Sequence, residues 1–127
     1  DGFVVVLVVR DVLKGCRVCF YSVGLGQLAA SGFMIFFDVE KGHRVLTPNT
    51  SIMSHQYSWG TWGKEHELVA VGKEFELTTE RMISHYKSCT GLNEKKIREF
   101  LLPATDVWLS AKEAKKYGIC DSIKVLR

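Results

Sequence analysis

Residues 17–38 read RVCFYSVGLGQLAASGFMIFFD, and the fold class can be approached from this stretch. Its first part, residues 17–23, is rich in β-branched and aromatic residues and is bounded by glycines, which predicts a buried strand. Residues 24–27 are rich in glycine and predict a turn. Residues 31–38 are apolar nearly all round, as expected of a short helix buried in a core. A strand, a turn and a buried helix in this order favour an α/β layered domain.

The same alternation of strands and helices continues to the end of the chain. Glycine, proline and capping residues mark the boundaries of these segments. The expected elements are strands at 43–46 and 51–55, a loop of glycines and tryptophans at 57–63, a long amphipathic helix at 64–88 closed by Gly91, a shorter helix at 94–102 begun by Asn93 and stopped by Pro103, an irregular loop at 104–110, a helix at 110–118 capped by Ser110 and Glu113, and a strand at 119–125.

The composition is that of a soluble globular protein of one domain. The chain has 127 residues, of which 46% are hydrophobic and 24% charged, and its net charge is +3. Basic residues are dispersed among acidic ones, which favours solvated helix faces over a nucleic-acid surface. The apolar run near the start is interrupted at Arg10 and Asp11, so it is too short to span a membrane. We therefore expect no nucleic acid and no membrane as a partner.

Four cysteines raise the question of a metal or redox site. Cys16 and Cys19 form a single C-x-x-C pair without a second pair at ligand spacing, and on an extended strand their side chains would point to opposite faces. We therefore expect buried or half-buried free thiols at these two positions and at Cys89 and Cys120. Free thiols suit a reducing, intracellular compartment.

Ser31 is the candidate nucleophile. It stands in the first turn of the predicted buried helix, where free backbone N–H groups favour developing negative charge. Its neighbours Ala29, Ala30 and Gly32 are small enough to let an acyl group approach, and the Gly32 amide is placed to donate to an oxyanion. The alternative is that Ser31 is only the N-cap of the helix.

A nucleophilic hydroxyl needs a base and an orienting carboxylate. His55 ends a predicted strand just before the irregular loop, which makes it the best candidate for the base. Asp106 lies among apolar residues in the loop after Pro103 and is the best candidate for the carboxylate. The other histidines are expected to be structural or exposed, and the competing carboxylates to be a helix end and a strand-edge residue; they are His43, His66 and His85, and Asp38 and Asp121.

Several longer stretches carry a family resemblance. The runs AASGFMIFF (29–37), GHRVLTPNTSIMSHQ (42–56) and DVWLSAKEAKKYGICDSI (106–123) resemble the Clp-type serine peptidases, the ClpP family. In that family a serine after two alanines begins a helix, a histidine lies in an IMxHQ strand, and an aspartate precedes an aromatic-Leu-Ser-Ala segment. The resemblance assigns Ser31 as nucleophile, His55 as general base and Asp106 as orienting acid.

The resemblance also implies a fold. It is an α/β domain of the ClpP/crotonase-like type, with repeated β-β-α layers and a protruding long helix, the handle. We expect residues 1–127 to form one such domain without the N-terminal strands of the family, and the missing initiator methionine suggests a fragment or a processed product. The run after Gly2 is helical by resemblance, although its β-branched residues favour a strand. Gly32 and Gly2 are the expected oxyanion-hole residues.

The function that the resemblance implies is serine endopeptidase activity on unfolded polypeptides or short peptides, by acyl transfer and without a metal or cofactor. In the family, subunits form stacked heptameric rings that work with an AAA+ unfoldase, and the handle helix joins the rings. Trp59 and Trp62 would suit such an interface. The expected location is the cytoplasm, or the stroma or matrix of an organelle.

Two alternatives from other classes stay open. A non-catalytic subunit or scaffold of the same fold is favoured if the oxyanion strand is missing, whereas the complete set of Ser31, His55 and Asp106 argues against it. An acyl-CoA enzyme of the crotonase type would use backbone donors and carboxylates, and has no need of a serine–histidine pair. Labelling with a fluorophosphonate distinguishes these classes.

Overall fold

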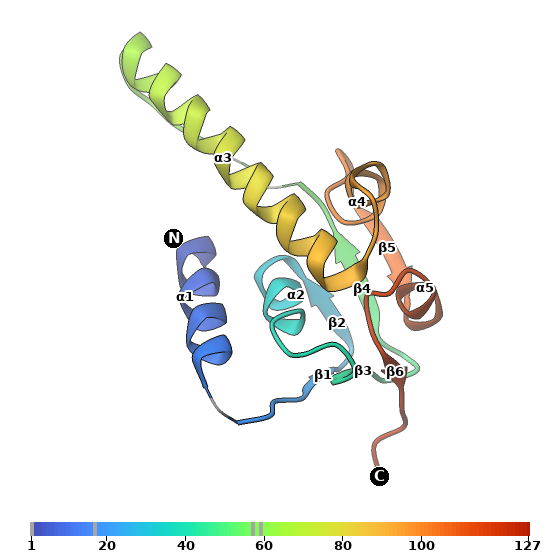
Figure 1. The fold of residues 1–127 in the computed structure, drawn as a ribbon. Coiled ribbons are helices and arrows are strands. Elements are labelled where there is room, and N and C mark those ends of the chain that lie inside the picture. The colour runs from blue at the N-terminus through green and yellow to red at the C-terminus, as the bar shows by residue number, and fades with distance from the viewer. Residues whose placement is uncertain (1, 17, 57, 59) are drawn as a thin grey trace.

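The computed structural model describes the backbone of residues 2–16, 18–56, 58 and 60–127, and the side chains of these residues except 2–7, 10, 30 and 31. Figure 1 shows how the helices and strands are arranged. In chain order the elements are α1 (Gly2–Gly15), β1 (Ser22–Gly24), β2 (Gln27–Ala29), α2 (Ala30–Phe36), β3 (Arg44–Leu46), β4 (Ser51–Ser54), α3 (Glu65–Thr90), α4 (Glu94–Phe100), β5 (Val107–Ser110), α5 (Ala111–Lys116) and β6 (Ser122–Ile123).

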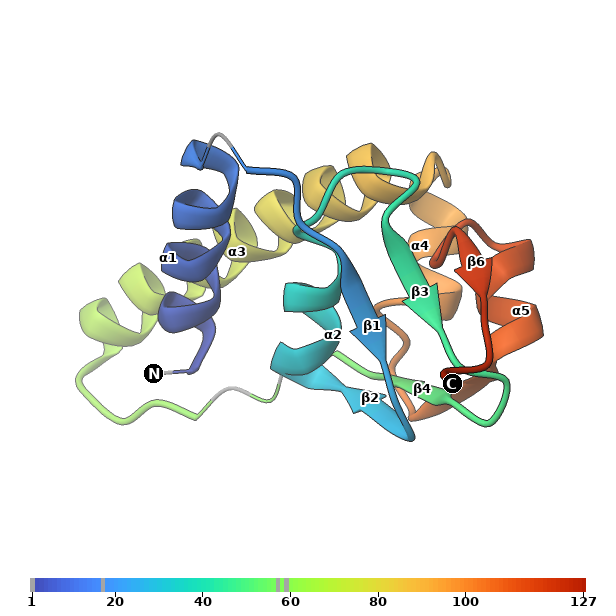
Figure 2. The same ribbon diagram turned by 90° about the horizontal axis from the view of Figure 1, so that it is seen from below.

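Two three-stranded sheets organise the fold. The first has the order β1-β3-β6, and its strands are all parallel. The second has the order β2-β4-β5, in which β2 runs parallel and β5 antiparallel to β4. Because β1 leads directly into β2, and β3 into β4, each of these pairs gives one strand to each sheet (Figure 2). This is the expected pattern of repeated β-β-α layers.

The strand expected at 17–23 forms only at its end. Strand β1 begins at Ser22, where the backbone amide donates to the carbonyl of His43. The segment that would pair with residues 18–21 is the turn before β3, so these residues have no strand beside them among the described parts of the chain. The turn expected at 24–27 is shorter as well, because β2 begins at Gln27. The residues typical of strands therefore begin several positions before the point at which β1 finds a partner strand.

The irregular segment between α1 and β1 leaves two cysteines on the surface. Cys16 and Cys19 are exposed, so the prediction that they are buried or half-buried is wrong. The prediction holds for Cys89, which is half-buried, and for Cys120, which is buried. Burial raises the pKa of both of these thiols, because it disfavours the charged thiolate.

The C-terminal strands also differ from expectation. Residues 107–110 form strand β5, where an irregular loop was expected, because Val107 and Leu109 pair with β4 and turn toward the core. The strand expected at 119–125 is confined to β6, which pairs with Val45 and Leu46 of the equally short β3. The length of a strand depends on the length of the strand it pairs with, and the local sequence does not contain that information.

Helix α1 forms despite its β-branched residues. Gly2–Gly15 is helical, as the family resemblance implied and the β-branched content did not. A β-branched residue in a helix costs only about 0.5 kcal/mol relative to alanine, so tertiary packing can override the preference. Helix α1 lies beside α2 in both views, and the two helices are in contact.

Helix α3 is the protruding long helix. It spans Glu65–Thr90 and ends at Gly91, whose φ of 73° is left-handed, so the predicted glycine cap is confirmed. Its buried residues all lie at or after Thr78, and the half before that point extends away from the body of the domain (Figure 1). The capping box at Ser110 and Glu113 is also formed, at the start of α5.

The core lies where α2, the two sheets and the second half of α3 meet. Helix α2 contributes its aromatic face, and the rings of Phe33 and of Phe37, the C-cap residue, lie 4.7 Å apart between centroids at an interplanar angle of 60°. Helices α4 and α5 close the other side. The most buried apolar residues of this cluster, each at most 3% exposed, are Phe33, Met34, Phe36, Phe37, Leu46, Ile52, Met82, Tyr86, Ile97, Leu101, Ala111, Ala114, Ile119 and Cys120.

A buried ion pair joins β3 to the residue before β6. Arg44 is only 1% exposed, and its Nε and Nη2 donate to the two carboxylate oxygens of Asp121 at 3.0 and 2.9 Å. The backbone amides of Gly42 and Arg44 donate to Asp121 Oδ2 as well. Partial burial by itself would raise the pKa of Asp121, but these hydrogen bonds hold it below its ordinary value.

Candidate active site

The three predicted catalytic residues follow or precede strands of one sheet. In the pairing register, Ala29 of β2 lies opposite Met53 of β4, and Ser54 of β4 lies opposite Val107 of β5. Because β2 and β4 are parallel, they end at the same edge of the sheet. Because β5 is antiparallel to β4, it begins at that edge. Neighbouring strands lie about 4.8 Å apart, so these three strand ends span about 10 Å.

Ser31 stands just beyond the end of β2. It is the second residue of α2, which begins at Ala30 immediately after the strand. The N-cap position is held by Ala29, with extended backbone dihedrals and no side-chain hydrogen bond. The alternative in which Ser31 is the N-cap of this helix is therefore wrong. The Ser31 side chain lies outside the described residues.

His55 follows the last residue of β4 and is half-buried. Its Nδ1 lies 2.5 Å from the carbonyl oxygen of Gln56. A carbonyl can only accept a hydrogen bond, so this contact requires a proton on Nδ1. The same tautomer leaves the lone pair on Nε2, the nitrogen that acts as base in serine peptidases.

Asp106 precedes the first residue of β5 and is exposed. Among the side chains that the structure describes, no hydrogen bond joins Asp106 to His55. The two segments are nevertheless tied together, because the backbone amide of Gln56 donates to the carbonyl of Pro103 at 3.0 Å. This bond places the residue after His55 beside the loop that leads to Asp106. Gln56 acts here through its backbone, so no residue pattern could have indicated it.

The competing carboxylates belong to other parts of the fold. Asp121 is engaged by Arg44, as described above. Asp38 follows α2, is buried, and lies 3.7 Å from Nε2 of the buried His85 on α3. His66 is exposed at the outer end of α3. Of the candidate histidines and carboxylates that the structure describes, His55 and Asp106 are the ones next to the ends of β4 and β5 at the edge where β2 ends.

The two glycines expected at the oxyanion hole lie on different helices. Gly32 is the third residue of α2 and is exposed, and a Cβ added there would meet nothing within 4 Å. Gly2 is the first residue of α1, not part of an extended strand. The space around the Gly2 α-carbon lies outside the described residues, so its role stays a prediction.

A cavity opens beside the residue after His55. Its volume is about 430 Å³, and its walls come from Gln56, from the middle of α3 and from α4. Apolar surface comes from Phe75 and Met82 of α3 and from Leu102 after α4. Arg98 of α4 supplies a positive charge, and Glu76 and Glu80 of α3 supply two negative charges. The cavity is large enough for one or two amino-acid side chains. Sequence patterns did not predict it, because it depends on how the consecutive helices α3 and α4 pack together and on the position of Gln56 beside them.

The similarity to known proteins extends over almost the whole chain. The model of the Clp protease family matches residues 3–126. This chain belongs to the Clp protease family. The resemblance seen in the sequence motifs is thereby confirmed, and the long helix α3 corresponds to the expected handle.

Individual Clp proteases show the same similarity. The ATP-dependent Clp protease proteolytic subunit 3 of Rhizobium meliloti (strain 1021) is 30% identical over 115 residues, which is 91% of this chain and 58% of that protein. The ATP-dependent Clp protease proteolytic subunit of Paracoccus denitrificans is 28% identical over 115 residues, covering 91% of this chain and 57% of that protein. The chain therefore spans somewhat more than half the length of these Clp protease relatives.

A solved Clp protease structure has the same fold. It is a mutant of ClpP1 from Listeria monocytogenes, with a TM-score of 0.82 and 30% sequence identity, covering 96% of this chain and 66% of that one. The expected ClpP-like α/β fold is therefore confirmed. Among the described residues, no helix of this Clp protease chain is long and apolar enough to cross a membrane.

Proposed function

We propose that this chain is a serine endopeptidase of the Clp type, formed by residues 1–127 as one peptidase domain. The observation that carries the proposal is the meeting of three strand ends at one sheet edge, with Ser31, His55 and Asp106 next to them. Membership of the Clp protease family supports the same chemistry. The substrates would be short peptides or unfolded polypeptides.

The mechanism is acyl transfer. The Ser31 hydroxyl attacks a peptide carbonyl, and His55 Nε2 accepts the hydroxyl proton. The Gly32 amide, with Gly2 as the second donor, would stabilise the oxyanion. His55 then gives this proton to the leaving amine as the C–N bond breaks, which leaves the acyl group on Ser31. Water, deprotonated by the same nitrogen, releases the acyl group and regenerates the serine.

Asp106 would orient the imidazole during this cycle. The contact of His55 Nδ1 with the Gln56 carbonyl supports the required tautomer. A carboxylate in place of that carbonyl would also stabilise the imidazolium that forms after proton transfer. We therefore propose that Nδ1 turns from Gln56 to Asp106 in the competent state. Exposure of Asp106 leaves its carboxylate able to make this movement.

The cavity beside Gln56 would accept a substrate side chain. It adjoins the residue next to the proposed base, and apolar surface from Phe75, Met82 and Leu102 lines it. An apolar residue next to the cleaved bond would bury this surface on binding. We therefore propose a preference for apolar side chains at that substrate position.

Assembly and partners follow as part of the same proposal. The half of α3 before Thr78 has no buried residue, and Leu68 and Val69 on it are 40% and 69% exposed. Trp62 in the preceding loop is fully exposed, at 100%, whereas Trp59 lies outside the described residues. Apolar surface of this kind supports self-association, in stacked rings as in the family. The relatives named ATP-dependent support an AAA+ unfoldase partner, and the cytoplasm, or the stroma or matrix of an organelle, is the proposed location.

Labelling with a fluorophosphonate tests the proposal. The reagent attacks an activated serine, and mass spectrometry of the modified peptide identifies which one. We expect the label on Ser31 and none on the Ser31→Ala variant. The matched control is Ser84→Ala, which removes an exposed serine on α3 and should be labelled as wild type. Label on another serine would show that Ser31 is not the nucleophile, and no label on a folded chain would favour the non-catalytic subunit.

A further inference from the structure

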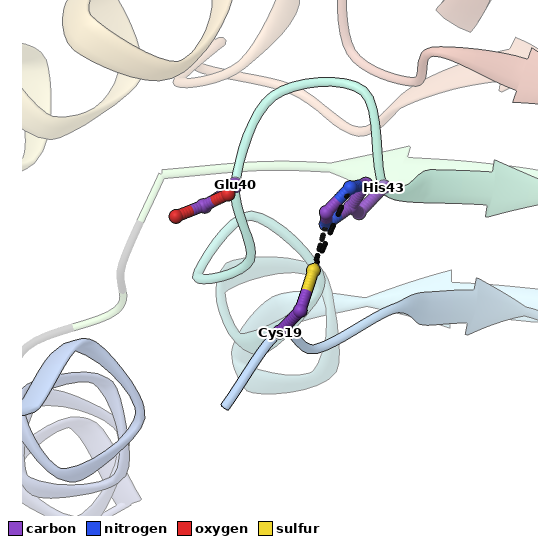
Figure 3. Close-up of side chains that lie close together, drawn as sticks. All are labelled: Cys19, Glu40 and His43. Atoms are coloured by element: carbon purple, nitrogen blue, oxygen red, sulfur yellow. Dashed lines mark hydrogen bonds between the residues drawn. The ribbon is translucent and has the colours of Figure 1, made fainter. Parts of the chain in front are cut away.

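A group of three potential metal ligands lies outside the proposed peptidase site. Cys19 comes from the irregular segment between α1 and β1, and Glu40 and His43 come from the loop between α2 and β3. One ligand atom from each lies within 4.8 Å of the other two. Figure 3 shows the sulfur of Cys19, on the segment before β1, facing the ring of His43. Glu40 lies on the same loop as His43. Cys19 and Glu40 are exposed, and His43 is half-buried.

The His43 ring is held from two sides. Its Nδ1 lies 3.1 Å from the carbonyl oxygen of Phe20, which requires a proton on Nδ1 and leaves the lone pair on Nε2. The Tyr21 ring stacks on the imidazole at a centroid distance of 4.2 Å and an interplanar angle of 25°. A histidine whose second nitrogen donates to a backbone carbonyl is the usual arrangement of a metal ligand.

The Cys19 side chain must turn to share an ion with this nitrogen. Its Sγ lies 3.2 Å from His43 Nδ1 and 3.7 Å from Nε2, so it faces the ring on the Nδ1 side. An ion bound to sulfur at about 2.3 Å and to nitrogen at about 2.05 Å, with tetrahedral angles, separates these two ligands by about 3.6 Å. Cys19 and Glu40 are both exposed, so rotation about their own side-chain bonds can bring the sulfur and the carboxylate to an ion on Nε2.

We infer that Cys19, Glu40 and His43 form a surface site for Zn²⁺, with water in the fourth position. A thiolate, a carboxylate and a neutral imidazole are all ligands that Zn²⁺ accepts, and the two negative charges balance the charge of the ion. Binding breaks the S–H bond of Cys19, forms a sulfur–zinc bond and releases one proton to solvent. This site is separate from the proposed peptidase residues and does not depend on them.

Zinc at this position would restrain the segment that follows helix α1 relative to the first sheet. Cys19 follows α1 by a few residues, whereas Glu40 and His43 lead into β3 at the centre of the first sheet. The bound ion would cross-link the two segments and restrict the irregular connection between α1 and β1. Amide hydrogen exchange in α1 would then become slower, because local opening of this region would require loss of the metal.

Metal binding to the full chain, purified without a histidine tag, tests the inference. Equilibrium dialysis against roughly 10 μM free Zn²⁺, a level that even a modest three-ligand site should fill, is expected to give one ion per chain. Each of Cys19→Ser, Glu40→Gln and His43→Gln should weaken binding by at least about tenfold. The matched control is Cys16→Ser, an exposed cysteine in the same segment but outside the cluster, which should bind as wild type.

Two further readouts complete the test. Cobalt(II) in place of zinc should give a sulfur-to-metal charge-transfer band that disappears in Cys19→Ser and stays in Cys16→Ser. Hydrogen exchange should show slower exchange in α1 when zinc is added to the wild type alone. The inference fails if the wild type binds no zinc, if Cys19→Ser retains the ion, or if Cys16→Ser loses binding as strongly as Cys19→Ser.

Discussion

Replacing Asp121 by asparagine isolates the contribution of the buried ion pair with Arg44. Arg44 is 1% exposed, and Asp121 accepts from both its Nε and its Nη2. The Asp121→Asn variant keeps the shape of the side chain but removes the charge, and it turns N–H groups toward the guanidinium. A buried arginine without its counter-charge costs about 3–5 kcal/mol of unfolding free energy. Domains of this size have only about 5–15 kcal/mol in total, so the loss is large.

Urea unfolding measures this loss. With a slope of about 1.5 kcal/mol per molar urea, the midpoint should fall by about 2–3 M. The matched control is Glu94→Gln, which breaks the pair between Glu94 and Arg98 at the same distance of 2.9 Å, but with side chains 55% and 50% exposed. An exposed pair one helical turn apart contributes about 0.5 kcal/mol or less, so the control midpoint should hardly move.

The pH dependence gives a second measure of the same ion pair. The pKa of Asp121 is lowered in the folded state, so its contribution is fully present above the ordinary aspartate pKa and is lost as the pH falls through the lowered value. The wild type should therefore lose stability between about pH 5 and pH 2 more steeply than Asp121→Asn. Equal midpoint shifts for Asp121→Asn and Glu94→Gln, or parallel pH curves, would refute the reasoning.

Three more predictions concern the backbone, the base and the assembly. Gly118→Ala should lower the unfolding free energy by about 1–2 kcal/mol or more in a thermal unfolding assay, because φ is 74° and the added Cβ would lie 2.9 Å from the Thr90 carbonyl oxygen. In the same assay the control Gly72→Ala should raise the unfolding free energy by up to about 1 kcal/mol, because Gly72 lies inside α3 and the added Cβ would meet nothing within 4 Å. Peptide hydrolysis should increase with pH if His55 is the base, because a base must be unprotonated to accept the Ser31 proton, and a rate that does not change with pH would remove His55 from the mechanism. Trp62→Ser should shift the chain toward smaller species in light scattering, because loss of a main contact weakens the association free energy by about 2 kcal/mol or more. An unchanged molar mass would exclude that role for Trp62.

Local signals in the sequence predicted the features that depend on neighbouring residues. The left-handed cap at Gly91 and the capping box of Ser110 with Glu113 both formed where expected. These motifs satisfy backbone groups within a few positions of each other, so their outcome hardly depends on the rest of the fold. Features that need a distant partner were predicted less well. The strand expected at 17–23 formed only from Ser22, because its partner β3 begins with Arg44.

The candidate site was only partly accessible from sequence. Sequence patterns indicate that Ser31 follows a strand and that His55 ends one, but they predict a loop where β5 follows Asp106. The common sheet edge depends on the order β2-β4-β5, which no local pattern contains. No local pattern brings Cys19 together with His43 either, because His43 lies 24 positions away along the chain.

The central claim is that Ser31 and His55 act as one catalytic unit at the edge of the second sheet. A double-mutant cycle of kcat/KM on a short fluorogenic peptide, with Ser31→Ala, His55→Ala and both together, tests it most directly. Residues that act as one unit are strongly non-additive, so each single variant should lose several orders of magnitude, and the double variant no more than either. Losses that multiply, or a His55→Ala variant within about tenfold of wild type, would contradict the claim.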